Sequence, residues 1–282
     1  MNLSQEKQIE YSIAAIKEII AETEKESIKI ELDLSHKPTI FESKFAGLGY
    51  VPHDQQIPVD SQNTQLRLLA QIECSKIDLE NFPEKGLLQF WVVDDDLVGA
   101  DFDEPTLQEG FRIIYFESVD ETVTEEEVAA KVIEPDDDES YFPVEKEVAL
   151  KFLKSKDALS YGDYRFEKLF TEKFNKLSVD EPIDDIFSLD FNIFDVSDKT
   201  CSEHLSKSGW GHKTGGYPSF TQMDPRNEDD GFDTVLLQID SGKIDDKHEI
   251  LWGDMGICNF FINSEDLKKC DFSNVIYNWD CY

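Results

Sequence analysis

The hydrophobic positions near the N-terminus first follow the spacing of a helix and then the alternation of a strand. Isoleucines recur every three or four residues between charged residues, which predicts an amphipathic helix over residues 4–26. Ile28, Ile30 and Leu32 then alternate with polar residues, which predicts a half-buried strand over residues 27–34. The helix carries more Glu than Lys, so we expect it to lie on the protein core and not on a membrane surface.

One hydrophobic pattern occurs twice in the chain. The stretch LLAQIECSKID at residues 68–78 returns as VLLQIDSGKID at residues 235–245, and the two align without gaps at an offset of 167. Solenoid repeats recur every ~20–50 residues, so this long period predicts an ancestral unit that was copied once. The same offset aligns two upstream pairs, Gly49 and Tyr50 with Gly216 and Tyr217.

Each copy of the repeat predicts a strand that is covered on both faces, because apolar residues occupy successive positions. Gln71 and Gln238 occupy equivalent places within these strands. A buried amide must find hydrogen-bond partners, so both glutamines are expected either to clamp a loop or to face a ligand.

The region between the copies has a different character. Residues 111–119 predict another strand, and residues 117–147 then contain 13 acidic and 2 basic residues. Blocks of like charge repel one another and stay solvated, which predicts an exposed acidic excursion. Beyond it, residues 148–152 alternate as an edge strand. Asp163 is a candidate N-cap for a helix with apolar positions at Phe166, Leu169, Phe170 and Phe174.

These elements predict an α+β fold, mostly antiparallel β, in which two related β units pack into one globule with peripheral helices. The units cover approximately residues 40–116 and 207–282, and residues 117–206 form an acidic and helical insertion. We therefore expect residues 1–282 to form a single domain.

The net charge of the chain limits the kinds of partner that it can bind. With 61 acidic and 27 basic residues, the formal net charge is −34, so the summed field repels nucleic acid and anionic membranes. No long apolar run and no signal-peptide pattern is present, which predicts a cytoplasmic protein. Five cysteines without paired spacing favour reduced thiols over a disulfide framework.

The sequence offers few candidates for catalysis or metal binding. Cys258 is expected to be a small core residue, not a nucleophile. Cys201, His204 and His212 give at most three zinc ligands, and the acidic stretches 94–104 and 227–233 do not match the spacing of an EF-hand. We therefore predict no metal and no cofactor, and expect these stretches to be solvated loops.

A glycine-rich loop is the most distinctive local feature. Four glycines between residues 209 and 216 surround His212 and Lys213, with His204 and Lys207 upstream. The loop is not a Walker motif, because no Gly-Lys-Ser/Thr sequence closes it. Two interpretations stay open: a turn that needs glycine for its dihedral angles, or an anion-binding nest of backbone amides.

Several motifs in fixed order carry a family resemblance. The stretches KFAGLGYVP, LLAQIECSKID, KGLLQFWV and FRIIYF, followed by GGYPSFTQMDPR, LLQIDSGKID, WGDMGICNFFI and YNWDCY, resemble the YwqG-like family of bacterial proteins, a domain-of-unknown-function family. The resemblance covers nearly the whole chain. It implies a predominantly β, α+β fold in a soluble bacterial protein, and it transfers no activity and no catalytic residue.

Two functions of different classes follow. The first is a non-catalytic binding protein whose acidic surface meets a basic protein partner, with the contact at the four consecutive acidic residues Asp136, Asp137, Asp138 and Glu139. The second is a small-molecule or anion binder, or an enzyme, with its site in the groove between the two repeats. The residues expected to line such a groove are Tyr50, Gln71, Tyr217, Gln238, His212 and Lys213.

Overall fold

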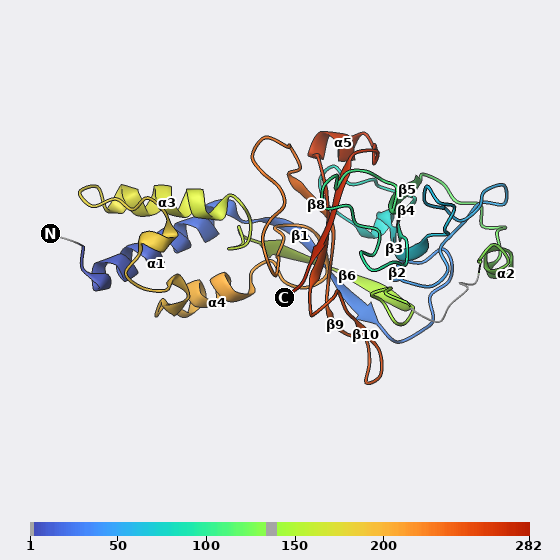
Figure 1. Ribbon diagram of the computed structural model, residues 1–282, viewed down its shortest axis with the longest axis horizontal. Coiled ribbons are helices and arrows are strands. Elements are labelled where there is room, and N and C mark those ends of the chain that lie inside the picture. The colour runs from blue at the N-terminus through green and yellow to red at the C-terminus, as the bar shows by residue number, and fades with distance from the viewer. Residues whose placement is uncertain (1–2, 134–139) are drawn as a thin grey trace.

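The computed structural model describes residues 3–133 and 140–282 and shows an α+β fold with two parts (Figure 1). A layer of helices surrounds the N-terminal segment at one end of the molecule. A ten-stranded sheet forms the other end and curls until it is nearly closed. All strand pairs that make up the large sheet are antiparallel, as the sequence predicts.

The strand order of the large sheet is β12-β11-β8-β7-β1-β6-β2-β3-β4-β5. The first half of the chain supplies β1 (Lys25–Asp33), β2 (Lys44–Phe45), β3 (Arg67–Glu73), β4 (Leu87–Val92) and β5 (Phe111–Phe116). The second half supplies β6 (Val148–Asp157), β7 (Lys213–Gly215), β8 (Thr234–Asp240), β11 (Ile257–Ile262) and β12 (Val275–Asp280). A separate hairpin pairs β9 (Gly242–Lys243) with β10 (Glu249–Ile250).

The two predicted β units lie on opposite sides of a central strand pair. Strands β2 to β5 lie on one side of β1 and β6, and β7, β8, β11 and β12 lie on the other. The first halves of the repeated stretches form β3 and β8, each seven residues long and buried along most of its length. The second halves differ, because residues 74–76 form a 3-10 helix whereas the equivalent residues 242–243 form β9. Common descent of the two units stays a prediction from the sequence.

Strand β6 corrects one expectation. The alternation at residues 148–152 predicts an edge strand, but β6 runs through Asp157 and pairs with both β1 and β2. Strand β2 pairs only with Val148 and Ala149, so the outer half of β6, which carries the exposed side chains, pairs with β1 alone and keeps the character of an edge.

The helical layer contains α1 (Gln5–Thr23), α3 (Phe166–Leu177) and α4 (Lys199–Lys207). Helix α1 begins at Ser4, whose side chain accepts a hydrogen bond from the Lys7 amide. Its buried face packs against apolar residues of α3 in a core separate from that of the sheet. Shorter helices complete the chain: η1 (Cys74–Lys76), α2 (Glu125–Ala129), η2 (Ile186–Ser188), η3 (Ile193–Asp195) and α5 (Ser264–Lys268).

Asp163 is not the N-cap of α3, which corrects a second expectation. The cap position belongs to Arg165, and the buried Asp163 carboxylate instead accepts hydrogen bonds from Arg165 and Arg226. The helical periodicity predicted α3 correctly, but the Asp163 carboxylate forms ion pairs with Arg165 and Arg226 instead of capping the helix.

The core of the sheet lies between its two curled halves. Phe260 on β11 faces Phe90 on β4 at a ring distance of 4.9 Å and stacks on Tyr277 of β12 at 4.6 Å. At the seam, the amide of Tyr277 donates to Pro105 O at 2.9 Å, so a loop covers this edge strand. None of the helices within residues 3–133 and 140–282 has both the length and the hydrophobicity needed to cross a membrane.

Candidate functional site

The two repeated glutamines are the centres of two similar loop clamps. Gln71 Oε1 accepts the amide of Tyr50 at 2.9 Å, and its Nε2 donates to Ile40 O and Glu42 O. Both glutamines are fully buried. Gln238 Oε1 accepts the amide of Ser219 at 2.8 Å, and its Nε2 donates to two carbonyls in the same way, Gly209 O and Gly211 O.

The clamps revise the alignment upstream of the repeat. Ser219, and not Tyr217, takes the place that Tyr50 has in the first clamp, which is an offset of 169 instead of 167. Tyr50 and Tyr217 accordingly have different partners. The Tyr50 hydroxyl accepts the amide of Asp120, whereas the Tyr217 hydroxyl donates to Thr23 O.

A buried lysine accompanies each clamp. Lys213 pairs with Gln238 across β7 and β8, and its Nζ donates to Tyr217 O at 2.6 Å and to Asp157 Oδ2 at 2.7 Å. Burial lowers the pKa of Lys213, and the Asp157 carboxylate opposes that effect. The lysine is therefore occupied inside the protein.

The matching lysine of the first clamp was not anticipated from the sequence. Lys44 pairs with Gln71 across β2 and β3 and donates to Leu48 O at 2.9 Å and to Glu147 Oε1 at 2.8 Å. Each lysine thus binds the carbonyl four residues ahead of it and one carboxylate. A lysine a few residues before a glycine-rich turn is a weak sequence signal. Only the offset of 169 between Lys44 and Lys213, which the clamps share, could have revealed the equivalence of the two lysines.

The six residues predicted to line a groove therefore fall into two groups. Tyr50 and Gln71 lie with β3, whereas the other four lie around β7 and β8, and four strands separate β3 from β8 in the sheet. Each group bonds to its own loop. The geometry is that of structural clamps that hold the two glycine-containing loops.

The glycine-rich loop turns its polar groups inward. The amide of Gly211 donates to Asp240 Oδ2 at 2.9 Å, and the loop carbonyls accept from Gln238. Gly209 and Gly211 have φ values of +85° and +89°, which favour glycine. The loop thus has the contacts of a turn that needs glycine.

His212 is neutral and packed inside the sheet. Its ring lies 5.3 Å from the ring of Phe45, and its Nδ1 accepts the amide of Asp240 at 3.0 Å. Burial lowers the pKa of His212 to about 4, and an Nδ1 that accepts a hydrogen bond must be unprotonated. His212 and Lys213 therefore do not form an exposed basic pair.

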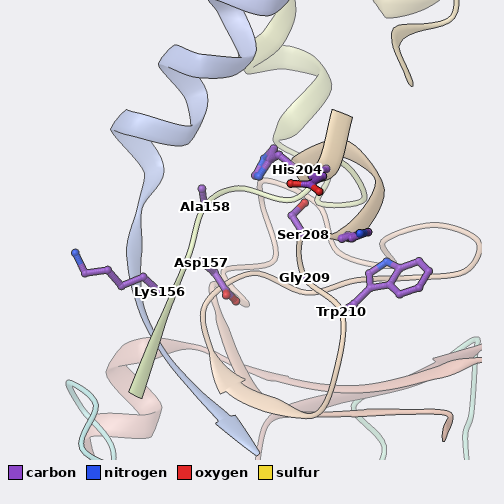
Figure 2. Close-up of a pocket in the computed structure, with 9 residues that line it drawn as sticks. Lys156, Asp157, Ala158, His204, Ser208, Gly209 and Trp210 are labelled. Carbon is purple, nitrogen blue, oxygen red and sulfur yellow. The ribbon is translucent and has the colours of Figure 1, made fainter. Parts of the chain in front are cut away.

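An open hollow of about 470 Å³ lies beside this loop, where the helical layer meets the sheet (Figure 2). It is lined by the end of β6, the C-terminal end of α4 and the residues Ser208 to Trp210. Ser208 Oγ is buried and has no hydrogen-bond partner among the described residues. Trp210 is 60% exposed, and Figure 2 shows Lys156 directed away from the other labelled side chains.

The five cysteines are free thiols, and burial raises the pKa of four of them, Cys74, Cys201, Cys258 and Cys270. Burial raises the pKa of Cys74 to about 12 and that of Cys201 to about 11, and it raises the pKa of the fully buried Cys258 further. Cys201 Sγ contacts Ile13 O, while His204 Nε2 bonds to Leu159 O. These contacts are those of packed side chains.

The acidic loops use their carboxylates to shape turns. Asp95 accepts the amides of Leu97 and Gly99, and Asp230 accepts the amide of Asn227. Over residues 3–133 and 140–282, no group of three or more His, Cys, Asp and Glu side chains is arranged to hold a metal ion. The predicted partner contact, Asp136 to Glu139, lies outside the described residues.

The fold and the clamps define a class of α+β protein built on one curled antiparallel sheet with two clamped loops. The chain belongs to the family described as "Domain of unknown function (DUF1963)", whose model matches residues 43–281. The match begins one residue before β2 and contains both glutamines, whereas α1, β1 and the carbonyls of Ile40 and Glu42 in the first clamp lie outside it. No curated protein matches the sequence.

Proposed function

We propose that this protein is a non-catalytic binding protein whose acidic surface binds a basic protein partner. The observation that carries the proposal is that most acidic side chains lie at the surface of the protein. Among the described residues, the charged residues that are buried as a whole are three acidic and four basic ones, Asp33, Asp163, Asp280, Lys44, Lys173, Lys213 and Arg226. Burial therefore removes a larger share of the basic residues than of the acidic ones, and the excess of negative charge lies at the surface.

An acidic surface of this size favours association with a basic protein. Long-range attraction raises the rate of encounter, and it weakens as salt shortens the Debye length to ~8 Å near physiological ionic strength. A net charge of −34 also exceeds the roughly 2–8 charges that keep a small domain soluble. The raised pKa values of Cys74, Cys201 and Cys258 disfavour nucleophilic thiolates, and the His212 Nδ1 is occupied by a hydrogen bond, which supports binding over catalysis.

The test compares two variants with the same charge. One neutralises the predicted contact with Asp136→Asn, Asp137→Asn, Asp138→Asn and Glu139→Gln. The other neutralises four exposed carboxylates elsewhere, with Asp96→Asn, Asp103→Asn, Glu104→Gln and Asp254→Asn. Each removes four negative charges and leaves −30.

Capture of basic proteins from a lysate of the source organism is then measured across a salt series. We expect capture by the natural protein to fall steeply with salt and to be weakened by at least one of the two variants. Capture that is indifferent to salt, or unchanged in both variants, contradicts the proposal.

The hollow beside the glycine-rich loop supports a second candidate, a small polar ligand. The buried Ser208 hydroxyl without a partner carries it, because a buried hydroxyl usually finds a hydrogen bond and a ligand could supply one. Ser208→Ala, with Ser206→Ala on the exposed face of α4 as the control, tests it by thermal shift against a library of small polar metabolites. A ligand that stabilises both variants equally contradicts this candidate.

A narrower family placement also belongs to this proposal. The order of motifs supports placing the chain in the YwqG-like branch as a bacterial, cytoplasmic protein whose two β units arose by duplication. The paired clamps at Gln71 and Gln238 support the duplication.

A further inference from the structure

A cluster of exposed apolar side chains surrounds the end of strand β12. We call it the Trp279 surface and define it as Trp279 with four exposed neighbours. The neighbours are Leu97 (44% exposed), Phe102 (51%), Met255 (52%) and Tyr282 (75%).

Hydrogen bonds and ring contacts show that these residues lie close together. Trp279 Nε1 donates to Leu97 O at 2.7 Å, and the rings of Trp279 and Phe102 lie 6.2 Å apart. On the other side, the amide of Tyr282 donates to Asp254 O, next to Met255. Three separate segments of the chain, residues 97–102, 254–255 and 279–282, therefore contribute to one surface.

The loop that presents Leu97 is held in a strained shape. Val98 has φ +51°, which is unusual for a β-branched residue. Asp95 Oδ1 accepts the amides on both sides of it, and Val98 O accepts the hydroxyl of the buried Tyr277 at 2.8 Å. Met255 is also left-handed, with φ +63°. Such strain persists only where the surroundings enforce it, and it is concentrated at functional sites.

A rim of free carboxylates accompanies the apolar residues. Asp96, Asp103, Glu104 and Asp254 are exposed, and within the described chain their side chains make no hydrogen bond or ion pair. The flanking segments 94–104 and 251–256 contain no Lys or Arg. The surface thus combines apolar anchors with uncompensated negative charge.

We propose that the Trp279 surface binds a basic amphipathic segment of a protein partner. The apolar face of that segment covers Phe102 and Met255, and its Lys or Arg side chains meet the acidic rim. Methionines suit this role because their flexible side chains adapt to different apolar partners, and aromatic residues are enriched at the centres of interfaces. A second copy of this chain fits less well, because two surfaces of the same negative charge repel each other.

This inference rests on the proposed function and gives it a location. The probe is a synthetic peptide of Leu and Lys, patterned so that a helix has one apolar and one basic face. A scrambled peptide of the same composition has the same charge without the apolar face. Binding of both is measured by fluorescence anisotropy near physiological salt.

The decisive variant is Phe102→Ser with Met255→Asn, since asparagine tolerates a left-handed backbone. The matched control is Val179→Asn with Phe187→Ser, which removes two apolar side chains of equal or greater exposure from the helical layer. Leu97→Ser is a second, independent variant in case the first unfolds.

We expect the patterned peptide to bind more tightly than the scrambled one. We expect the decisive variant to weaken it by about tenfold or more, and the control by less than about twofold. Equal, salt-sensitive binding of both peptides, unaffected by Phe102→Ser with Met255→Asn, overturns this site while the proposed function stands. Absence of binding by both peptides overturns both. Concentration-dependent dimerisation that Phe102→Ser abolishes also overturns the inference, because the occupant is then a second copy.

Discussion

Replacing Gln238 with methionine tests the loop clamps most directly. Methionine has nearly the same length and shape but cannot accept or donate the three hydrogen bonds. The change leaves the amide of Ser219 and the carbonyls of Gly209 and Gly211 without their partner in a fully buried site. Each buried group left unsatisfied costs about 1–3 kcal/mol, and carbonyls are at the lower end. We expect the free energy of unfolding to fall by about 3–5 kcal/mol.

The measurement is urea denaturation followed by tryptophan fluorescence and by far-UV circular dichroism. Gln56→Met is the matched control, because Gln56 is exposed and makes no hydrogen bond that the structure describes. A loss of 3–5 kcal/mol lowers the melting temperature by roughly 2–4 °C per kcal/mol in a protein of this size. Gln71→Met has an equal or greater effect, because Gln71 also accepts a hydrogen bond from Gln89.

A loss of less than about 1 kcal/mol in Gln238→Met, similar to the control, would refute the reasoning. It would mean that the loop can rearrange so that water satisfies the freed groups. The glycine-rich loop would then be held by its own turn geometry.

Three further predictions concern single residues. The pKa of His212 is about 4 in the folded protein and 6.5 in the unfolded one, so the unfolded state binds more protons between these values and stability falls as the pH drops from 6.5 to 4. The loss reaches about 3 kcal/mol, and His212→Asn, whose Oδ1 can replace Nδ1 as acceptor, should remove that part of the acid sensitivity in denaturation curves. Burial and the charge of Arg165 lower the pKa of Lys25 to about 8 in the folded protein. Mass spectrometry after brief acetylation at pH 8 should therefore find Lys25 modified faster than surface lysines in the folded protein and at the same rate as the others in the unfolded protein; slower modification in the folded protein would contradict this. Gly216→Ala should destabilise the protein by several kcal/mol, on the order of 3, because φ is +63° and a methyl group would overlap the Asp157 carboxylate; a melting temperature equal to the natural protein's would contradict this.

Local periodicity predicted most of the elements correctly. The isoleucine spacing found α1, the alternation found β1, and the Phe166 to Phe174 pattern found α3. These succeed because one face of a helix or strand must be apolar to reach the core, and that requirement is written in neighbouring residues. The α+β class and the antiparallel sheet follow from the same patterns and are confirmed.

The candidate site was less accessible to sequence reasoning. Burial of Gln71 and Gln238 and the clamp role follow from apolar neighbours and the rule that buried amides find partners. The identity of the residues that these two glutamines bind does not follow from the sequence. Ser219 takes the place expected for Tyr217, because the second copy has two fewer residues between the held amide and the glutamine, 19 positions instead of 21, and only the hydrogen bonds reveal the shift.

What the sequence by itself determined is therefore local: which segments are helices or strands, which faces are apolar, and how acidic the chain is. The tertiary structure decided the rest. It placed β6 inside the sheet, where β1 pairs with residues 149–157 and β2 with Val148 and Ala149 only, so the polar outer half of β6 has one paired side. It also paired Lys44 with Glu147 and Lys213 with Asp157, residues 103 and 56 positions apart in the chain. Ion pairs and strand pairing at such distances depend on how the whole chain folds, and no local pattern contains that information.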